Sequence, residues 1–226
     1  MKIFGDKEKF AIQFDFYTER GIEIHDDRYL MFGSAFFWVN GKNLFAYRDF
    51  GPDATFSYDL AILLDFFCDF LFYHITEDPF PAVTQSKIAV EMLEEFQLVE
   101  GEDNDVMKYL DVDWDNVDMD LHEKIYDWNV RHGFTANNGG SFLPHAYLRR
   151  VADKIEVSWE NNFPYKAEKG EVYMKYKKGV DYVDAKLYKE VIVKFCMELI
   201  NKFKENFPEK MQENYENLKK AIEVTL

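Results

Sequence analysis

Asp111, Asp113 and Asp115 have the type and spacing of the first three ligands of an EF-hand calcium loop. Such a loop also needs Gly at its sixth position and a bidentate Glu at its twelfth, where this sequence has Asn116 and His122. The loop therefore lacks two features that calcium coordination requires. We interpret these aspartates as a solvated acidic connector or a partner-binding surface, with weak calcium binding as the remaining alternative.

His122 and Glu123 begin like the H-E-x-x-H motif of zinc peptidases, but Tyr126 occupies the position of the second histidine. Asp65 and Asp69 lie four residues apart and would share one face of a helix, where paired carboxylates can hold a metal or perform acid–base chemistry. Without a matching His or Glu elsewhere, we favour an exposed helix face for this pair. Phosphate-binding glycine loops and the G-x-S-x-G nucleophile motif are absent from the sequence. We therefore expect no metal site, no cofactor and no enzymatic activity.

A loop rich in glycine and asparagine is predicted between His132 and His145. Its Gly139 and Gly140 could expose a cluster of backbone N–H groups that binds an anion. A tight turn that requires glycine is the simpler interpretation. A pocket lined by the two histidines and a carboxylate would instead indicate an enzyme of unrecognised type.

Two short β-like runs, Ala146–Val151 and Lys154–Trp159, are predicted to form a hairpin after this loop. A two-residue turn between them places Arg149 opposite Glu156 as a cross-strand ion pair. The same register places Arg150 on the apolar face. We expect that guanidinium to need an acidic partner or an aromatic ring.

Hydrophobic periodicity predicts the elements that position these residues. Alternation over residues 10–17 indicates a half-buried strand, and Asn40-Gly41 between two apolar runs indicates a hairpin turn that pairs Trp38 with Asn43. A further strand is predicted over residues 171–176. Helices are predicted where apolar residues recur at helical spacing, over residues 57–75, 86–98, 121–128, 185–205 and 211–222.

The order of these elements predicts an α+β fold rather than a parallel βαβ fold. We expect an antiparallel sheet of about five or six strands packed with four to five helices. The 226 residues fit a single domain, residues 1–226, with an acidic connector at 99–117 and a C-terminal helical pair at 184–225. Almost half of the residues are apolar and 18% are aromatic, which suffices for a large core.

Charge is distributed unevenly along the chain. Residues 91–127 hold fourteen acidic and two basic side chains, in a chain whose net charge is −15. Such a field repels phosphate and anionic lipid, so we expect no direct nucleic-acid binding and no membrane binding, and a protein partner that is basic. Cys68 and Cys196 fall in apolar helical patterns and are interpreted as buried thiols of a cytoplasmic protein. We recognise no signal peptide and no membrane-spanning run.

Two motifs are familiar in combination. One is GSAFFWVNGKNL at residues 33–44, and the other is GGSFLP at residues 139–144, which continues through Arg149, Arg150 and Asp153 to IEVSW at residues 155–159. Together they resemble the N-terminal module of bacterial proteins whose C-terminal part is an ImmA/IrrE-type zinc metallopeptidase, over about residues 10–205. The resemblance implies a sensing or binding role in stress response or phage conflict. It implies no catalytic residues, and the peptidase motif is absent here.

Two function hypotheses follow, and the oligomeric state is left open. The first is a non-enzymatic protein-recognition module in bacterial defence or phage counter-defence, whose candidate binding residues are Asn138, Gly139, Gly140, Arg149, Arg150, Glu156 and Trp159. The second is an acidic immunity or inhibitor protein that covers a basic nuclease or nucleic-acid-binding surface. Its candidate surface consists of Asp103, Asp105, Asp111, Asp113, Asp115 and Asp118.

Overall fold

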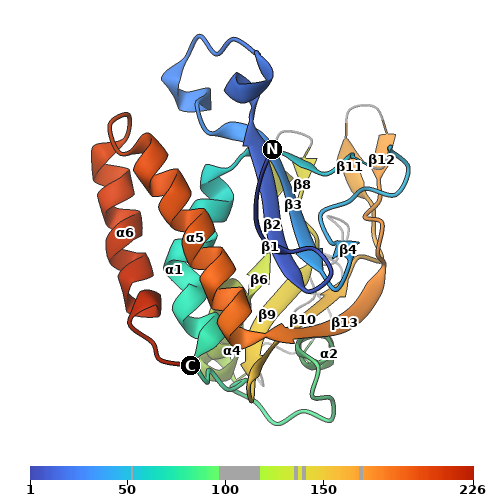
Figure 1. Ribbon diagram of the computed structural model, residues 1–226. Helices are drawn as coiled ribbons and strands as arrows, with labels where there is room; N and C mark the ends of the chain where they lie inside the picture. The colour runs from blue at the N-terminus through green and yellow to red at the C-terminus, as the bar shows by residue number, and fades with distance from the viewer. Residues whose placement is uncertain (52, 97–117, 135–136, 139–140, 168–169) are drawn as a thin grey trace.

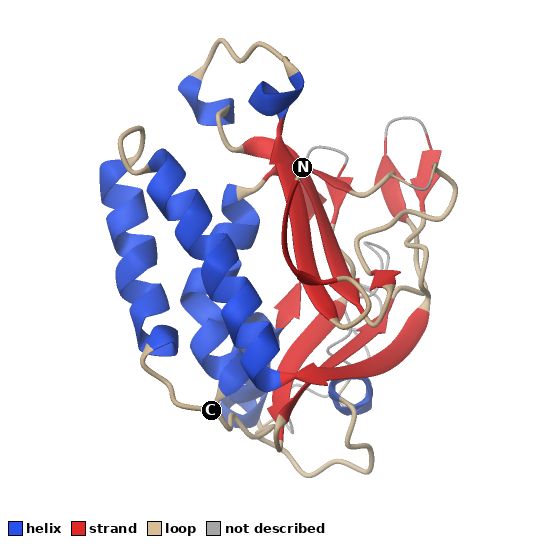
Figure 2. Ribbon diagram, viewed as in Figure 1, coloured by secondary structure: helices blue, strands red, loops and turns tan. Residues whose placement is uncertain are grey.

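A computed structural model describes residues 1–51, 53–96, 118–134, 137–138, 141–167 and 170–226 of the chain. The three long helices gather on one side of the strands, and every strand pairing among the described residues is antiparallel (Figures 1 and 2). The α+β fold class predicted from the order of elements is therefore confirmed.

The N-terminal part of the chain forms a five-stranded sheet in which β1, β2, β3 and β4 are neighbours in that order and β5 also pairs with β3. Two 3₁₀ helices, Tyr17–Arg20 and Asp27–Tyr29, connect β2 to β3. The strand bounds are Lys2–Asp6 for β1, Phe10–Phe16 for β2, Phe32–Val39 for β3, Lys42–Asn43 for β4 and Phe56–Asp59 for β5.

A second sheet has the order β13-β10-β9-β6, and two short ladders join β7 to β8 and β11 to β12. The bounds are Gly133–Phe134 for β6, Asn137–Asn138 for β7, Ser141–Phe142 for β8, Ala146–Val151 for β9, Lys154–Glu160 for β10, Tyr165–Ala167 for β11, Gly170–Val172 for β12 and Lys178–Asp184 for β13. The strands are thus divided between two main sheets.

Three long helices cover the strands on one side: α1 (Ala61–Ile75), α5 (Ala185–Phe203) and α6 (Pro208–Ile222) (Figure 1). α1 packs against α5, α6 and β9, while α5 also packs against β1 and β2. Two further helices, α2 (Ala89–Glu95) and α4 (Met119–His132), pack against β9. Among the helices in the described residues, none combines the length and apolarity that a membrane span requires.

The main core lies between α1, α5 and the two sheets and is rich in phenylalanine. Phe37 contacts Phe10, Phe67 and Phe134 with ring centroids 5.2 to 6.3 Å apart. Cys68 and Cys196 are buried in this core as free thiols, as their apolar surroundings in the sequence predict. The prediction of a single domain stays a prediction.

The hairpin between β3 and β4 confirms the strongest local signal in the sequence. Asn40 and Gly41 both have positive φ, 46° and 80°, which this two-residue turn requires. The turn pairs Trp38 with Asn43, as predicted.

Two predicted elements have clearly different bounds from those expected, and one strand, β13, was not predicted. The stretch 57–75 begins as strand β5, and the helix starts only at Ala61, whose N–H is bonded to the Asp59 side chain. The stretch 171–176 is a strand only as far as Val172. β13 was not predicted because three of its seven residues are charged and a fourth is Gly179, so no regular apolar alternation marks it. Its Gly179 leaves room for the Trp159 ring, which a Cβ would approach to 2.4 Å.

Candidate functional site

The β9–β10 hairpin carries a buried ion pair at the predicted register. Arg149 lies opposite Glu156, and the guanidinium donates to Glu156 Oε2 from Nη2 at 2.8 Å and from Nε at 3.2 Å. Glu156 has no solvent-exposed surface. A buried carboxylate needs all of its lone pairs satisfied, so its second oxygen requires partners as well.

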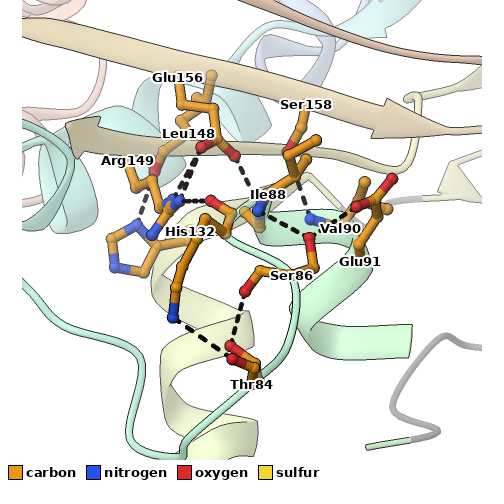
Figure 3. Close-up of polar contacts among 12 residues, drawn as sticks. Thr84, Ser86, Ile88, Val90, Glu91, His132, Leu148, Arg149, Glu156 and Ser158 are labelled. Carbon is orange, nitrogen blue, oxygen red and sulfur yellow. Dashed lines mark hydrogen bonds and ion pairs between the residues drawn. The ribbon is translucent and has the colours of Figure 1, made fainter. Parts of the chain in front are cut away.

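That second oxygen holds the first turn of α2 (Figure 3). Glu156 Oε1 accepts the Ala89 N–H at 2.7 Å, and Ser158 Oγ accepts the Val90 N–H at 3.3 Å. The first N–H groups of a helix lack partners within it, and a negative charge is favourable at this end of the helix dipole. Two side chains of one strand therefore cap a helix that is distant in the sequence.

The segment before α2 is held by the same cluster. Arg149 Nη2 donates to the Lys87 carbonyl, and Ser86 Oγ accepts the Ile88 N–H at 3.1 Å while donating to Glu91 at 2.6 Å. Hydrogen bonds from the backbone N–H groups of Ser86 and Gln85 lower the pKa of the nearby Glu95 carboxyl. We call Arg149, Glu156 and Ser158 the α2 clamp.

A second cluster holds α4 through Asp78, which lies in the loop after α1. Asp78 Oδ2 accepts from Arg131 Nε at 2.9 Å and from His132 Nε2 at 3.0 Å, and the Asp78 carbonyl accepts the Trp128 indole N–H at 3.1 Å. We call Asp78, Arg131 and His132 the α4 anchor.

His132 joins the end of α4 to strand β9 and to the loop that holds Asp78. Its Nδ1 contacts the Leu148 carbonyl at 2.6 Å and its Nε2 contacts the Asp78 carboxylate. Burial opposes the charge of Asp78, but the hydrogen bonds from His132 and Arg131 outweigh it and lower the pKa of this carboxyl.

α2 and α4 also share a small hydrophobic core that is separate from the main one. Its buried members are Ala89, Val90, Met92, Leu93, Ile125, Trp128 and Tyr147. Tyr147 lies on β9 and α2 also packs against β10, so the cluster lies on the second sheet. Glu95 at the end of α2 and Met119 at the start of α4 flank the acidic stretch. Both of its flanking helices are therefore fixed to one sheet by buried polar contacts and by apolar packing.

The predicted binding residues of the loop and hairpin differ in their exposure to solvent, and two of them are not described. Glu156 and Trp159 are 0% and 3% exposed, so they do not offer side-chain surface to a partner. Asn138 lies in β7, which pairs with β8, whereas Gly139 and Gly140 fall outside the described residues. The proposed roles of Glu156 and Trp159 as surface-binding residues are thus corrected: both are internal.

Arg150 has partners of a different kind from those expected. Its Nη1 donates to the Ile75 carbonyl at 3.0 Å, and its Nε donates to the Ala152 carbonyl at 2.8 Å. The expectation of an acidic partner or an aromatic ring was wrong, because the C-terminal carbonyl groups of α1 supply the negative partial charge instead.

The two histidines that flank the glycine-rich loop have different surroundings. His132 stacks on Trp128 with the ring centroids 4.2 Å apart, whereas His145 stacks on Tyr165 at 5.8 Å. Within the described residues, no group of three or more His, Cys, Asp or Glu side chains is placed to hold a metal ion.

The predicted acidic pairs and surfaces are only partly described. Asp65 and Asp69 share a helix face as predicted, but that face meets α6, where Asn214 and Asn217 donate to them at 3.1 and 2.8 Å. Asp118 is exposed and accepts the Leu121 N–H at the start of α4. The other predicted acidic residues lie outside the described part of the chain, namely Asp103, Asp105, Asp111, Asp113 and Asp115.

Sequence reasoning missed Ser158, Asp78 and the structural role of His132. Ser158 contacts a residue 68 positions away, and Asp78 contacts His132 across 54 positions. No short-range sequence pattern predicts contacts between residues this far apart. The one available signal was that Ser158 shares a strand face with Glu156.

Comparison with known proteins adds no further information: the chain matches no protein-family model, no curated protein and no solved structure. The resemblance to the module that accompanies ImmA/IrrE-type peptidases therefore stays a prediction.

Proposed function

We propose that this chain is a non-enzymatic recognition module that binds a basic protein through its acidic stretch and the helices that flank it. The observation that supports this is the double attachment of those helices, by the α2 clamp and by the α4 anchor. An acidic segment with fixed ends loses less conformational entropy on binding than a free tail does.

Charge explains which partner such a surface would select. Residues 91–127, which comprise the acidic stretch and parts of its two flanking helices, hold fourteen acidic and two basic side chains, a net charge of −12 out of −15 for the chain. Complementary charge accelerates association and excludes partners of like charge, including nucleic acids and anionic membranes. A basic protein is therefore the partner class that this surface favours.

A narrower version of this function is an immunity or inhibitor protein that covers a basic nuclease or nucleic-acid-binding surface. Such surfaces are basic because they neutralise phosphates, and an acidic protein competes for the same cationic side chains. A role in bacterial defence or phage counter-defence is part of this proposal and rests on the motif resemblance, while its cytoplasmic setting rests on the two free buried thiols.

The proposal is tested by capture from a bacterial lysate with two matched variants. One variant converts Asp103, Asp105, Asp111, Asp113 and Asp115 to Asn. The other converts exposed glutamates in and beside α6 to Gln, namely Glu205, Glu209, Glu213, Glu216 and Glu223. Each variant removes five negative charges. The net charge therefore changes equally in both, and only the location of the removed charges differs.

We expect the wild-type chain and the glutamate variant to retain a basic protein at about 50 mM salt and to release it at about 300 mM. The aspartate variant should retain roughly tenfold less of the basic protein than the wild-type chain does, since clustered charges act together. Equal retention by both variants, or no retained basic protein at all, would contradict the proposal.

A further inference from the structure

The outer face of α4 has an apolar strip beside an acidic strip. Met119, Tyr126 and Val130 are 55%, 56% and 39% exposed. At 3.6 residues per turn these three positions fall within an arc of about 40° around the helix axis. The exposed acidic positions of the helix occupy the adjoining arc of about 60°. They are Asp120, Glu123 and Asp127.

The opposite face of α4 fixes the direction in which these strips point. Ile125 and Trp128 are buried in the small core, and His132 is bonded to Asp78 and Leu148. Rotation of the helix about its axis would break these contacts. The strips are therefore a permanent feature of the surface.

Few cations compete for the acidic strip within α4 itself. Its basic side chains are Lys124 and Arg131. Arg131 is engaged by Asp78 and lies over the Tyr73 ring at 4.9 Å, whereas Lys124 is exposed one turn from Asp120 and offsets one of the three acidic charges. The outer face thus has a net negative charge next to exposed apolar surface.

We infer that the outer face of α4 binds a basic amphipathic helix of a protein partner. The inference rests on the proposed recognition function and assigns it a surface. An apolar strip gains stability when another apolar strip covers it, and an adjoining acidic strip selects cations beside that contact. A partner helix with apolar and basic residues on adjacent faces satisfies both requirements at once.

α6 provides an internal control because it also has an exposed Tyr followed by an acidic residue, but with lysines nearby. Tyr215 of α6 is 37% exposed and precedes Glu216, just as Tyr126 precedes Asp127 in α4. The last turn of α6 contains Lys219 and Lys220, which offset the negative charge of Glu216. We expect no docking there.

The test uses a synthetic peptide of about 18 residues in which Lys and Leu alternate with helical periodicity, and a scrambled peptide of the same composition. The peptides are titrated into the full-length chain while backbone amide NMR shifts are recorded. We expect the helical peptide to shift amides of α4, and the scrambled peptide to bind at least about tenfold more weakly.

Four variants locate the contact. Tyr126→Ser and Asp127→Lys should each weaken binding of the helical peptide by about tenfold, since one removes apolar area and the other reverses charge. Tyr215→Ser and Glu216→Lys should change it less than about twofold. All four positions are exposed, and melting temperatures verify that each variant folds.

Equal weakening by the α6 variants, or equal binding of both peptides, would overturn the assignment of this surface. If the α4 variants still capture a basic protein from lysate in a salt-sensitive manner, the recognition function stands and only its location on α4 is wrong. If neither peptide nor lysate protein binds, the recognition function itself is wrong.

Discussion

His74 shows how burial determines the chemistry of a single residue. It is fully buried, with Nδ1 2.9 Å from the Tyr188 hydroxyl and Nε2 2.8 Å from the Arg131 carbonyl. The carbonyl only accepts, so Nε2 carries the proton and Nδ1 accepts from Tyr188. Burial, followed by the nearby charge of His132, lowers the pKa of His74 from 6.5 to about 3. The ring is therefore neutral at neutral pH.

This shift has a defined sign in the pH dependence of stability. Below pH 6.5 the unfolded chain protonates His74, whereas the folded chain does not until about pH 3. Unfolding therefore binds a proton in that window, so the free energy of unfolding decreases as the pH is lowered, by up to about 1.4 kcal/mol per pH unit.

We predict that His74→Gln reduces this slope by about 1 kcal/mol per pH unit between about pH 6 and pH 4. Urea unfolding at a series of pH values measures the slope. The matched control is His25→Gln, because His25 is exposed and should leave the slope unchanged. An unaltered slope in the His74 variant would show that the ring titrates normally.

At the scale of elements, α2 is the clearest case of a helix held by contacts outside itself. It has seven residues, too few for an isolated helix to form in water. Its attachment depends on Glu156 and Ser158, which accept its first N–H groups, and on the small core beneath it. The helix should therefore open when the clamp is weakened.

We predict that Glu156→Gln destabilises the fold by about 3 kcal/mol, because the Arg149 guanidinium loses its buried counter-charge. Hydrogen exchange at the amides of α2 should accelerate more than exchange in α5. Glu190→Gln is the control, since Glu190 forms an exposed ion pair with Lys194 and should cost less than about 0.5 kcal/mol. Similar losses in both variants would mean that the clamp does not hold α2.

The β3–β4 hairpin gives a second prediction at this scale. Gly41→Ala should destabilise the chain by about 1–2 kcal/mol, because Gly41 has φ of 80° and L-residues disfavour that region. A Cβ there would also lie 3.2 Å from Glu8 Oε2. Thermal unfolding measures the loss. Gly51→Ala, which meets no atom within 4 Å, should be nearly neutral, and a comparable loss there would remove the turn as the cause.

Elements with local signals could be predicted from the sequence, and elements that depend on distant partners could not. The Asn40-Gly41 turn is encoded by two adjacent residues, and the residues of the Arg149–Glu156 pair are only seven positions apart. Both features were predicted. β13 and the contacts of Asp78 depend on residues that are distant in the sequence. Local residue spacing therefore cannot predict them. The candidate site was therefore predicted only as far as the β9–β10 hairpin, and the attachment of α2 and α4 needed the structure.

At the scale of the whole molecule, the chain combines an aromatic core with a net charge of −15 that is concentrated in residues 91–127. The helices α1, α5 and α6 support one side of the strands, while α2 and α4 lie with the acidic stretch between them in sequence. Net charge of this size raises solubility and directs association but does not determine the fold. The proposed recognition function accordingly assigns binding to the charged surface rather than to the core.

The most direct test of this account is the salt dependence of the affinity for the basic protein retained in the capture experiment. The dissociation constant, measured by calorimetry between about 50 and 300 mM salt, should rise by at least about tenfold for the wild-type chain and for the α6 glutamate variant. The Asp→Asn variant of residues 103–115 should bind weakly with little salt dependence. A dissociation constant that does not change with salt, or the same salt dependence in the Asp→Asn variant, would contradict recognition through the acidic surface.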